Sequence, residues 1–385
     1  MTGGRGAATL AAVLPQVLAH IGGAPVDGSP AFALPPAERV CLALVDGLGT
    51  RLLDRAADAD APFLRSLLPS AIQLTSGFPS STPISLCSLG TGRESGEHGI
   101  VGFFLRPSTE PTVIECLTWA EPGTRRPLID RFPPETLQPF PSRLADAAAD
   151  GIRTGVVSLA DHAGSGLSRA AFRGAAWIGL EHNSDVEERV TKVGAALVEA
   201  PSLVYTYDPR PDFAAHRAGV DSDAWREALR KTDGLLGALH ESLPRGTLLL
   251  VTGDHGAVDV PDRYRLDLAV RPDLLREVET VTGDARARHI HARPGRAAAV
   301  DAAWRAGLDP AHWAVRTRDE AIAAGWFGPT VRNEVRPRIG DVVVAATGDE
   351  ILLDMGRYPW EATFRAFHGG LTPDEVEVPL LVAAG

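Results

Sequence analysis

The chain has 385 residues, of which 44% are hydrophobic and 23% are charged, and its formal net charge is −11. These fractions exclude wholesale disorder, and the 39 glycines and 30 prolines follow no Gly-X-Y period, which excludes collagen. The acidic balance argues against a nucleic acid polymer or an anionic membrane surface as the main partner. An anionic substrate would therefore need a local source of positive charge.

The amino-terminal segment predicts a soluble helix over residues 8–21 and no targeting signal, because no basic stretch precedes a long apolar run. No run of about 18 apolar residues occurs in the sequence, so we expect no membrane span and a cytoplasmic location. Cys41, Cys87 and Cys116 lack Cys-x-x-Cys spacing, which argues against a disulfide scaffold and against a thiolate zinc site.

Short apolar runs alternate with helical patterns along most of the chain. The runs lie at residues 39–45, 155–159, 202–206, 247–251 and 380–383. Strands this apolar are usually covered on both faces, as in a parallel sheet flanked by helices. Helical patterns at 185–199 and 222–242 lie between the runs. The alternation predicts an α/β sandwich with a mostly parallel central sheet and helices on both faces.

The pattern changes between about residues 264 and 353, where short strands alternate with short helices. We predict a catalytic core formed by residues 1–263 and 354–385, and a small inserted α+β cap formed by residues 264–353. A basic cluster begins the predicted cap, with His289 and His291 on one face of a strand. Its members are Arg286, Arg288, His289 and His291. Two interpretations stay open: a wall facing an anionic substrate group, and a solvated cap surface, which we favour.

Two of the predicted strands end in residues suited to metal binding or acid–base chemistry. Asp46 follows the run 39–45 in a glycine-rich turn, and Asp254 and His255 follow the run 247–251 between two glycines. Ligands of α/β sheets lie beyond the carboxyl ends of the strands. For Asp46 taken alone, a turn aspartate bonded to its own backbone is the alternative.

Three further residues complete a possible ligand set. Asp212 and His216 are four residues apart, so on a helix they share a face and can hold one metal ion, with a surface ion pair as the alternative. His368 precedes two glycines, and a lone histidine of this kind is usually structural. The whole set consists of Asp46, Asp212, His216, Asp254, His255 and His368. These nitrogen and oxygen ligands suit zinc, and they divide into two groups that could hold two ions.

Ser81-Thr82-Pro83 predicts the start of a helix, with Thr82 as the N-cap and Pro83 as the first helical residue. A hydroxyl at this position lies beside free N–H groups and the positive end of the helix dipole, which together favour a bound phosphate. The alternative is a capped helix without a chemical role.

The order of these motifs resembles the type I phosphodiesterase/nucleotide pyrophosphatase family of the alkaline phosphatase superfamily. The resemblance extends from about residue 39 to the end of the chain. Its motifs are Asp46 after a strand, Phe78-Pro79-Ser80-Ser81-Thr82, Thr91-Gly92, His98-Gly99-Ile100, Asp212-x-x-x-His216, Asp254-His255-Gly256 and His368-Gly369. The resemblance implies an alkaline-phosphatase-like sandwich and two divalent ions, most suitably Zn²⁺. It implies that Asp46, Thr82, Asp254 and His255 hold one ion, that Asp212, His216 and His368 hold the other, and that Thr82 is the nucleophile.

Two residues are candidates for contacts with the substrate. Animal members of the family carry an asparagine three residues after the nucleophile, where this chain has Ser85. The Ser85 hydroxyl or a backbone N–H would then contact the phosphate. Arg93 is a candidate for the extra positive charge that a phosphomonoester requires.

The resemblance implies a two-metal phosphodiesterase or nucleotide pyrophosphatase that hydrolyses a small phosphate ester through a covalent phosphothreonine. A phosphomonoesterase and a phosphonate hydrolase on the same bimetal centre are the alternatives, followed by a non-catalytic relative that binds a phosphate ligand. The leaving group is not predicted, and we expect residues 102–126 and the cap to determine it.

Overall fold

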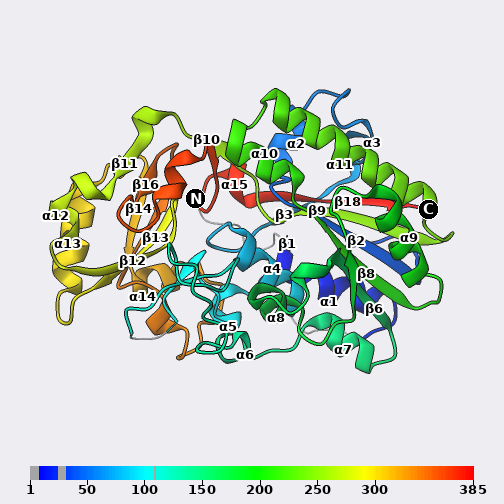
Figure 1. Cartoon of the computed structure of the whole chain (residues 1–385), viewed down its shortest axis with the longest axis horizontal. Coiled ribbons are helices and arrows are strands. Elements are labelled where there is room, and N and C mark those ends of the chain that lie inside the picture. Colours follow the sequence, from blue (N-terminus) through cyan, green and yellow to red (C-terminus); the bar gives the residue numbers. More distant parts are fainter. Residues whose placement is uncertain (1–7, 25–31, 108–109) are drawn as a thin grey trace.

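The computed structural model describes residues 8–24, 32–107 and 110–385. Two lobes lie side by side in Figure 1: a larger one built on a long twisted sheet, and a smaller one coloured mostly yellow and orange. The described helices include none with the length and apolar character needed to cross a bilayer.

Within the described residues, the larger lobe contains an eight-stranded sheet in the order β1-β3-β18-β9-β2-β8-β6-β7. All neighbours are parallel except β18, which runs antiparallel to both β3 and β9. In that order the strands are β1 (Ala8–Thr9), β3 (Ile72–Thr75), β18 (Glu377–Ala384), β9 (Thr247–Gly253), β2 (Arg39–Val45), β8 (Ser202–Asp208), β6 (Arg153–Leu159) and β7 (Trp177–Leu180). The predicted α/β sandwich with a mostly parallel sheet is confirmed.

Both faces of this sheet are buried, as its apolar strands predicted. In β2, Val40, Leu42 and Leu44 belong to one hydrophobic core, and the alternate residues Cys41, Ala43 and Val45 belong to another. The first core includes side chains of α1 (Leu10–His20), α4 (Thr82–Thr91), α7 (Arg143–Ala149) and α8 (Gly166–Phe172). The second includes side chains of α2 (Thr50–Arg55), α3 (Pro62–Leu67), α9 (Val186–Ala196), α10 (Arg210–Ala218) and α11 (Asp223–Ser242).

A side-chain cap marks the start of each of the two long predicted helices. Asp185 caps α9 by accepting from the Glu188 N–H, and Ser222 caps α11 by accepting from the Trp225 N–H. Each side chain satisfies one of the free N–H groups at a helix start.

Within the described residues, the smaller lobe contains a six-stranded antiparallel sheet in the order β14-β15-β13-β12-β4-β5. These strands are β14 (Trp313–Thr317), β15 (Val342–Ala346), β13 (Ala287–Ala292), β12 (Val278–Asp284), β4 (Phe104–Leu105) and β5 (Ile114–Glu115). Residues 264–353 therefore share their sheet with a segment that precedes them by far in the sequence. The boundaries of the inserted cap stay a prediction.

Short elements complete the described structure. The helices are α5 (Ser95–His98), α6 (Pro134–Leu137), α12 (Pro272–Leu275), α13 (Ala297–Gly307), α14 (Arg318–Ala323) and α15 (Pro373–Val376). The strand pairs are β10 (Val258–Asp259) with β17 (Ala366–Phe367), and β11 (Arg265–Asp267) with β16 (Ile351–Leu353). The 3₁₀ turns are η1 (Leu68–Ser70), η2 (Ala160–His162), η3 (Asp262–Tyr264), η4 (Leu268–Val270), η5 (Arg336–Arg338) and η6 (Pro359–Thr363).

The basic cluster of residues 286–291 lies inside the protein, so both interpretations from the sequence were wrong. Each of its four basic side chains is at most 1% exposed. Arg286 pairs with Glu375 at 2.6 Å, and Arg288 pairs with Glu361 at 2.5 Å. Burial lowers the pKa of His289 to about 3. Carboxylates far away in the sequence reach the two guanidinium groups, and this pairing allows the charges to be buried.

Candidate bimetal active site

Three neighbouring parallel strands bring the candidate acidic residues to one edge of the large sheet. Val45 at the end of β2 lies opposite Gly253 of β9 and Asp208 of β8. The next residues, Asp46 and Asp254, therefore emerge side by side. Asp212 follows β8 in the first turn of α10. Gly47, at φ +73°, passes Asp212 so closely that an added Cβ would lie 3.0 Å from the Asp212 Cβ, which only glycine permits.

Thr82 begins α4 directly below this edge. Its N-cap is Ser81, whose backbone is extended, so the predicted cap is shifted by one residue and Thr82 is the first helical residue. The Thr82 Oγ1 atom lies 3.2 Å from the His255 Nε2 atom. The hydroxyl thus stands at a helix N-terminus and against a candidate metal ligand.

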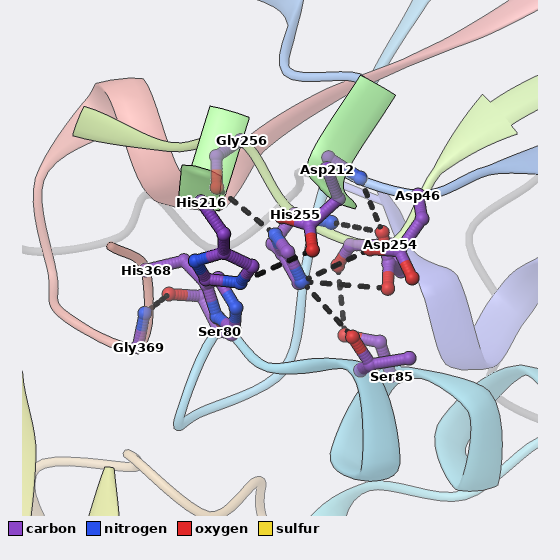
Figure 2. A network of polar contacts seen from close by, with 12 residues as sticks. Asp46, Ser80, Ser85, Asp212, His216, Asp254, His255, Gly256, His368 and Gly369 are labelled. Atoms are coloured by element: carbon purple, nitrogen blue, oxygen red, sulfur yellow. Dashed lines mark hydrogen bonds and ion pairs between the residues drawn. The ribbon is translucent and has the colours of Figure 1, made fainter. Parts of the chain in front are cut away.

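Among the described residues, two groups of side chains bring ligand atoms within 4.8 Å of one another: Asp46 with Asp254 and His255, and Asp212 with His255 and His368. His216 joins the second group through its Nε2 atom, 3.1 Å from the Asp212 Oδ2 atom. Figure 2 shows these side chains converging from the sheet edge, α10 and the His368 loop. All six residues of the predicted ligand set therefore meet in one place, and His255 lies between the two groups.

The carboxylates of this cluster need positive charge. The Oδ1 atoms of Asp46 and Asp212 and the Oδ2 atom of Asp254 are buried and have no hydrogen-bond partner within the described structure. Burial, and then repulsion from Asp254 and Asp212, raises the pKa of Asp46 well above its usual value. Burial also raises the pKa of Asp254. Two divalent cations would satisfy the free oxygens and remove the repulsion, so the residues present fit a bimetal centre.

The three histidines are oriented as metal ligands. Each Nδ1 atom lies 2.9–3.0 Å from a backbone carbonyl oxygen. Because a carbonyl only accepts, Nδ1 carries the proton and Nε2 keeps its lone pair for a ligand. The carbonyls belong to Ala366 for His216, Gly256 for His255 and Ser80 for His368.

Opposite charges within the second group also shift the pKa values of its members. Burial disfavours the ionised form of Asp212, but the imidazoles of His216, His368 and His255 outweigh it and lower the pKa of this carboxyl. Burial works against the imidazolium form of His216, but Asp212 outweighs it and raises the pKa of His216. In the metal-free protein, Asp212 therefore favours the imidazolium form of His216, and a bound cation would replace the proton on the His216 Nε2 atom.

Tyr207 contacts the candidate ligand cluster, a contact that the sequence did not reveal. Its hydroxyl donates a hydrogen bond to the Asp46 Oδ2 atom. Tyr207 lies in β8, one residue before the point where the strands end. The signal available in the sequence was a tyrosine near the carboxyl end of a predicted strand, because such a side chain can reach a ligand that follows the neighbouring strand.

The two predicted substrate contacts have other partners. Ser85 is fully buried, and its hydroxyl donates to the Asp254 carbonyl at 2.7 Å, which positions that ligand. Arg93 pairs with Glu97 at 2.7 Å and lies over the Phe140 ring, 3.9 Å from its centroid. Neither residue lines the two cavities described below, and a substrate contact of Ser85 or Arg93 stays a prediction.

A cavity of about 940 Å³ opens above the ligand cluster. Asp46, Thr82, Asp212, His216 and His368 form its floor. The segment 102–126, which we expected to shape the leaving-group site, contributes one wall through Phe103, Glu115, Leu117, Thr118, Ala120, Gly123 and Arg125. Asp284, Ala285 and residues 359–361 also line the cavity, next to Phe103.

A second cavity, of about 320 Å³, begins at the same threonine. The two cavities share Thr82, Leu117, Tyr207 and Pro209 and are otherwise lined by different residues. The smaller one is lined by Ser158, Ser165, Ser168, Trp177 and Tyr205, among others. The Tyr205 hydroxyl is buried and has no hydrogen-bond partner within the described part of the chain. Thr82 thus stands at the junction of two binding spaces.

An α/β sandwich with a threonine at a helix N-terminus, beside two Asp/His groups at the carboxyl edge of the sheet, is the arrangement of the alkaline phosphatase superfamily. Within it, the chain belongs to the type I phosphodiesterase/nucleotide pyrophosphatase family, whose model matches residues 40–371.

Solved structures share this fold. Murine ectonucleotide pyrophosphatase/phosphodiesterase 5 superposes with a TM-score of 0.66 at 18% identity, and the human protein of the same name with 0.65 at 16%. Each match covers 90% of this chain and 88% of the solved chain. An inactive Thr-to-Ala variant of the murine protein in complex with AMP gives 0.64 at 17%, with the same coverage.

One curated human protein, ectonucleotide pyrophosphatase/phosphodiesterase family member 7, is 39% identical to this chain over 66 residues. The matched stretch covers 16% of this chain and 14% of that protein's length.

Proposed function

We propose that the protein is a two-metal phosphodiesterase of the nucleotide pyrophosphatase type, which hydrolyses a small phosphate ester with Thr82 as nucleophile. Asp46, Thr82, Asp254 and His255 would hold one ion, and Asp212, His216 and His368 the other. Zn²⁺ suits this set of carboxylate and imidazole ligands best. When bound, such ions lower the pKa of a hydroxyl and offset the charge of the phosphate.

The residues of the chain prepare Thr82 for attack. Because α4 begins at Thr82, the positive end of the helix dipole faces the phosphate that this hydroxyl would attack. The Thr82 Oγ1 atom lies 3.2 Å from the His255 Nε2 atom, close enough for both atoms to hold the same ion. The attack forms the bond between the Thr82 oxygen and phosphorus and breaks the bond from phosphorus to the leaving alcohol. Water then hydrolyses the covalent phosphothreonine and restores Thr82.

The position of Thr82 at the junction of two cavities is the observation that carries the diester assignment. A phosphodiester has two substituents on phosphorus, and each cavity can receive one of them. A phosphomonoester has one substituent and needs additional positive charge around its free oxygens. Arg93, the candidate for that charge, lies with Glu97 and Phe140 instead.

The relatives support the same proposal. The family is named for phosphodiesterase and nucleotide pyrophosphatase activity. The murine relative in complex with AMP is a Thr-to-Ala variant described as inactive. A nucleophilic threonine and a nucleotide-sized phosphate ester are therefore the expectation for this chain.

The first experiment compares bis-p-nitrophenyl phosphate with p-nitrophenyl phosphate, using protein purified without chelator and analysed for bound metal. We expect up to two zinc ions per chain and at least about tenfold higher kcat/KM for the diester, a difference of about 1.4 kcal/mol in transition-state stabilisation. Equal or faster hydrolysis of the monoester would favour a phosphomonoesterase.

The second experiment tests the nucleophile. Thr82→Ala should abolish turnover and keep most of the bound metal, since the carboxylates and histidines remain. Thr91→Ala is the matched control, because Thr91 ends the same helix and its hydroxyl donates to the Cys87 carbonyl, away from both cavities. Near wild-type turnover by Thr82→Ala would refute the covalent route.

A further inference from the structure

A third cavity, of about 470 Å³, lies in the smaller lobe beside α14 (Figure 1). Among the described residues, its lining shares none with the two cavities beside Thr82. It therefore has no role in the proposed function. Its charged and polar lining residues are Arg106, His291, Arg318, Asn333, Arg336 and Asp341.

Segments far apart in the sequence build this cavity. Arg106 follows β4 directly, His291 lies in β13, and Arg318 begins α14. Arg336 begins the 3₁₀ turn η5, and Asp341 directly precedes β15. The fold of the smaller lobe thus brings three arginines from three separate segments to one hollow.

The lining of this cavity has more positive than negative charge. Among the described residues that form it, three are arginines and one, Asp341, is a carboxylate. Arg318 pairs with Asp341 at 2.8 Å, so these two charges offset each other. Asp341 also accepts a hydrogen bond from the Ala292 N–H at 2.9 Å, which fixes its position. The other two guanidinium groups therefore set the sign of the charge in the cavity.

The carboxylates that pair with these two arginines lie outside the lining. Glu279 lies 3.0 Å from Arg106, and Asp319 lies 2.6 Å from Arg336. The side chain of Glu279 is 36% exposed and that of Asp319 is 79% exposed. Because water screens an exposed carboxylate, an ion pair with it is weak. An anion inside the cavity would therefore compete well for the Arg336 guanidinium, which is itself partly exposed.

The positive potential of the cavity also reaches His291, which is buried in β13. Its Nε2 atom lies 3.1 Å from the Thr282 Oγ1 atom. Burial lowers the pKa of His291 well below 6.5, and the neighbouring His289 and Arg106 lower it further. Surroundings that disfavour a proton on this imidazole favour an anion in the cavity beside it.

The chemistry of the lining fits a phosphate group. A guanidinium binds phosphate oxygens through two parallel N–H···O bonds, and the Asn333 amide can donate further bonds. The chain as a whole carries a charge of −11, so only a local group of arginines attracts an anion to this lobe. A volume of about 470 Å³ exceeds that of a bare phosphate ion and leaves room for an organic body attached to it.

We propose that this cavity is a second phosphate-binding site, separate from the bimetal centre, which holds a small molecule by its phosphate group. Arg106, Arg318 and Arg336 contact the phosphate oxygens, and Asn333 donates a further hydrogen bond. Binding here makes and breaks no covalent bond. The site does not depend on the proposed function, because it shares no described lining residue with the cavities beside Thr82.

Calorimetric titration of the metal-loaded protein with inorganic phosphate tests the proposal. The wild type should bind one phosphate ion at the bimetal centre and one at the new site, the latter with a Kd of about 1 mM or lower. The competitive inhibition of bis-p-nitrophenyl phosphate hydrolysis by phosphate reports the first of these separately. A single phosphate per chain, with a Kd equal to that inhibition constant, would overturn the inference.

Two variants should move the Kd of the new site in opposite directions. Arg336→Gln removes a cation from the lining and should raise this Kd at least about tenfold. Asp319→Asn frees Arg336 from its exposed partner and should lower the Kd by about threefold. Arg305→Gln is the matched control. Arg305 is exposed to a similar degree and pairs with Glu320 of the same lobe, but it does not line this cavity.

These variants distinguish a specific site from a general attraction of anions. All three should leave the inhibition constant at the bimetal centre unchanged. If Arg305→Gln weakens phosphate binding as much as Arg336→Gln does, net charge is the cause and the inference fails. An unchanged Kd in both Arg336→Gln and Asp319→Asn would also overturn it. If Arg336→Gln does not fold, Asn333→Ala gives the second measurement and should raise the Kd by about threefold.

Discussion

The Arg286 guanidinium pairs with both carboxylate oxygens of Glu375, at 2.6 and 2.8 Å, and both side chains are completely buried. Arg286 lies in the turn between β12 and β13 of the smaller lobe, and Glu375 lies in α15 beside the large sheet. Glu375 also accepts a hydrogen bond from the Gly370 N–H at 2.7 Å. The ion pair therefore fastens the smaller lobe to the loop that carries His368.

Breaking this pair should destabilise the protein strongly. Glu375→Leu or Arg286→Met alone leaves one buried charge without its partner, which costs about 3–5 kcal/mol in the free energy of unfolding. The double variant Arg286→Met/Glu375→Leu should lose less than the sum of the single variants. Urea denaturation measures all three. Strict additivity would show that the two side chains do not depend on each other.

Tyr207 should matter for metal affinity. Tyr207→Phe removes the hydroxyl that donates to Asp46, so that ligand becomes less well oriented, and we expect about a 10–100-fold loss of metal affinity. Competition with a chromogenic chelator measures the change. Tyr205→Phe serves as the control, because the Tyr205 hydroxyl has no partner within the described structure. An equal loss in both variants would mean that the Asp46 contact is not the cause.

Tyr205 should instead affect substrates that place a large group in the smaller cavity. Its free hydroxyl lines the smaller cavity and gains a partner only when that cavity is filled. Tyr205→Phe should lower kcat/KM for bis-p-nitrophenyl phosphate by about tenfold, since leaving a polar ligand group unpaired costs about 1–3 kcal/mol. Methyl p-nitrophenyl phosphate, whose methyl group does not reach the hydroxyl, should react as before. Parallel losses on both substrates would show that the Tyr205 hydroxyl does not contact a substrate group in that cavity.

Removal of the metal should lower thermal stability, because the carboxylates of Asp46, Asp212 and Asp254 then face one another without cations. A chelator should reduce Tm by several degrees, since about 1 kcal/mol shifts Tm by roughly 2–4 °C in a chain of more than 150 residues. Zinc should restore it. Asp254→Asn should stabilise the metal-free protein and destabilise the metal-loaded one; the same sign in both states would contradict this account.

Stability should also decrease in mild acid through His98. Burial, and then the nearby Arg332 and Arg338, lowers the pKa of His98 to about 3 from 6.5. Below pH 6.5 the unfolded chain binds a proton that the folded protein refuses, so stability is lost as the pH falls, by about 1.4 kcal/mol per pH unit from this residue. Urea denaturation between pH 7 and 5 should show a shallower decline for His98→Gln. Identical slopes would exclude His98 as the cause.

The large lobe and the ligand cluster could be predicted from the sequence because each ligand follows a recognisable local pattern. Asp46 and Asp254 directly follow apolar strands, and the spacing of Asp212 and His216 places them on one helix face. The register between parallel strands then brings these patterns together. The pairing of Arg93 with Glu97, four residues later on the same short segment, was also readable in principle.

The smaller lobe could not be predicted in the same way because distant contacts decide its structure. Arg286 can be buried because it pairs with Glu375, and Arg288 because it pairs with Glu361. No local sequence pattern connects either pair. Without their partners in view, arginines in alternating positions look like a solvated strand.

The pairing of β4 with β12 limits which sequence changes the small sheet can tolerate. Gly283 of β12 lies opposite Phe104 of β4, so the small sheet is assembled from two separate stretches of the gene. Replacing residues 264–353 alone by a foreign segment would leave β4 and β5 with a neighbour they do not match. Phe103, just before β4, and Asp284, which ends β12, line the larger cavity next to each other. Among related proteins, the segment with β4 and β5 should therefore vary together with residues 264–353. A change in substrate preference should be accompanied by substitutions in both stretches.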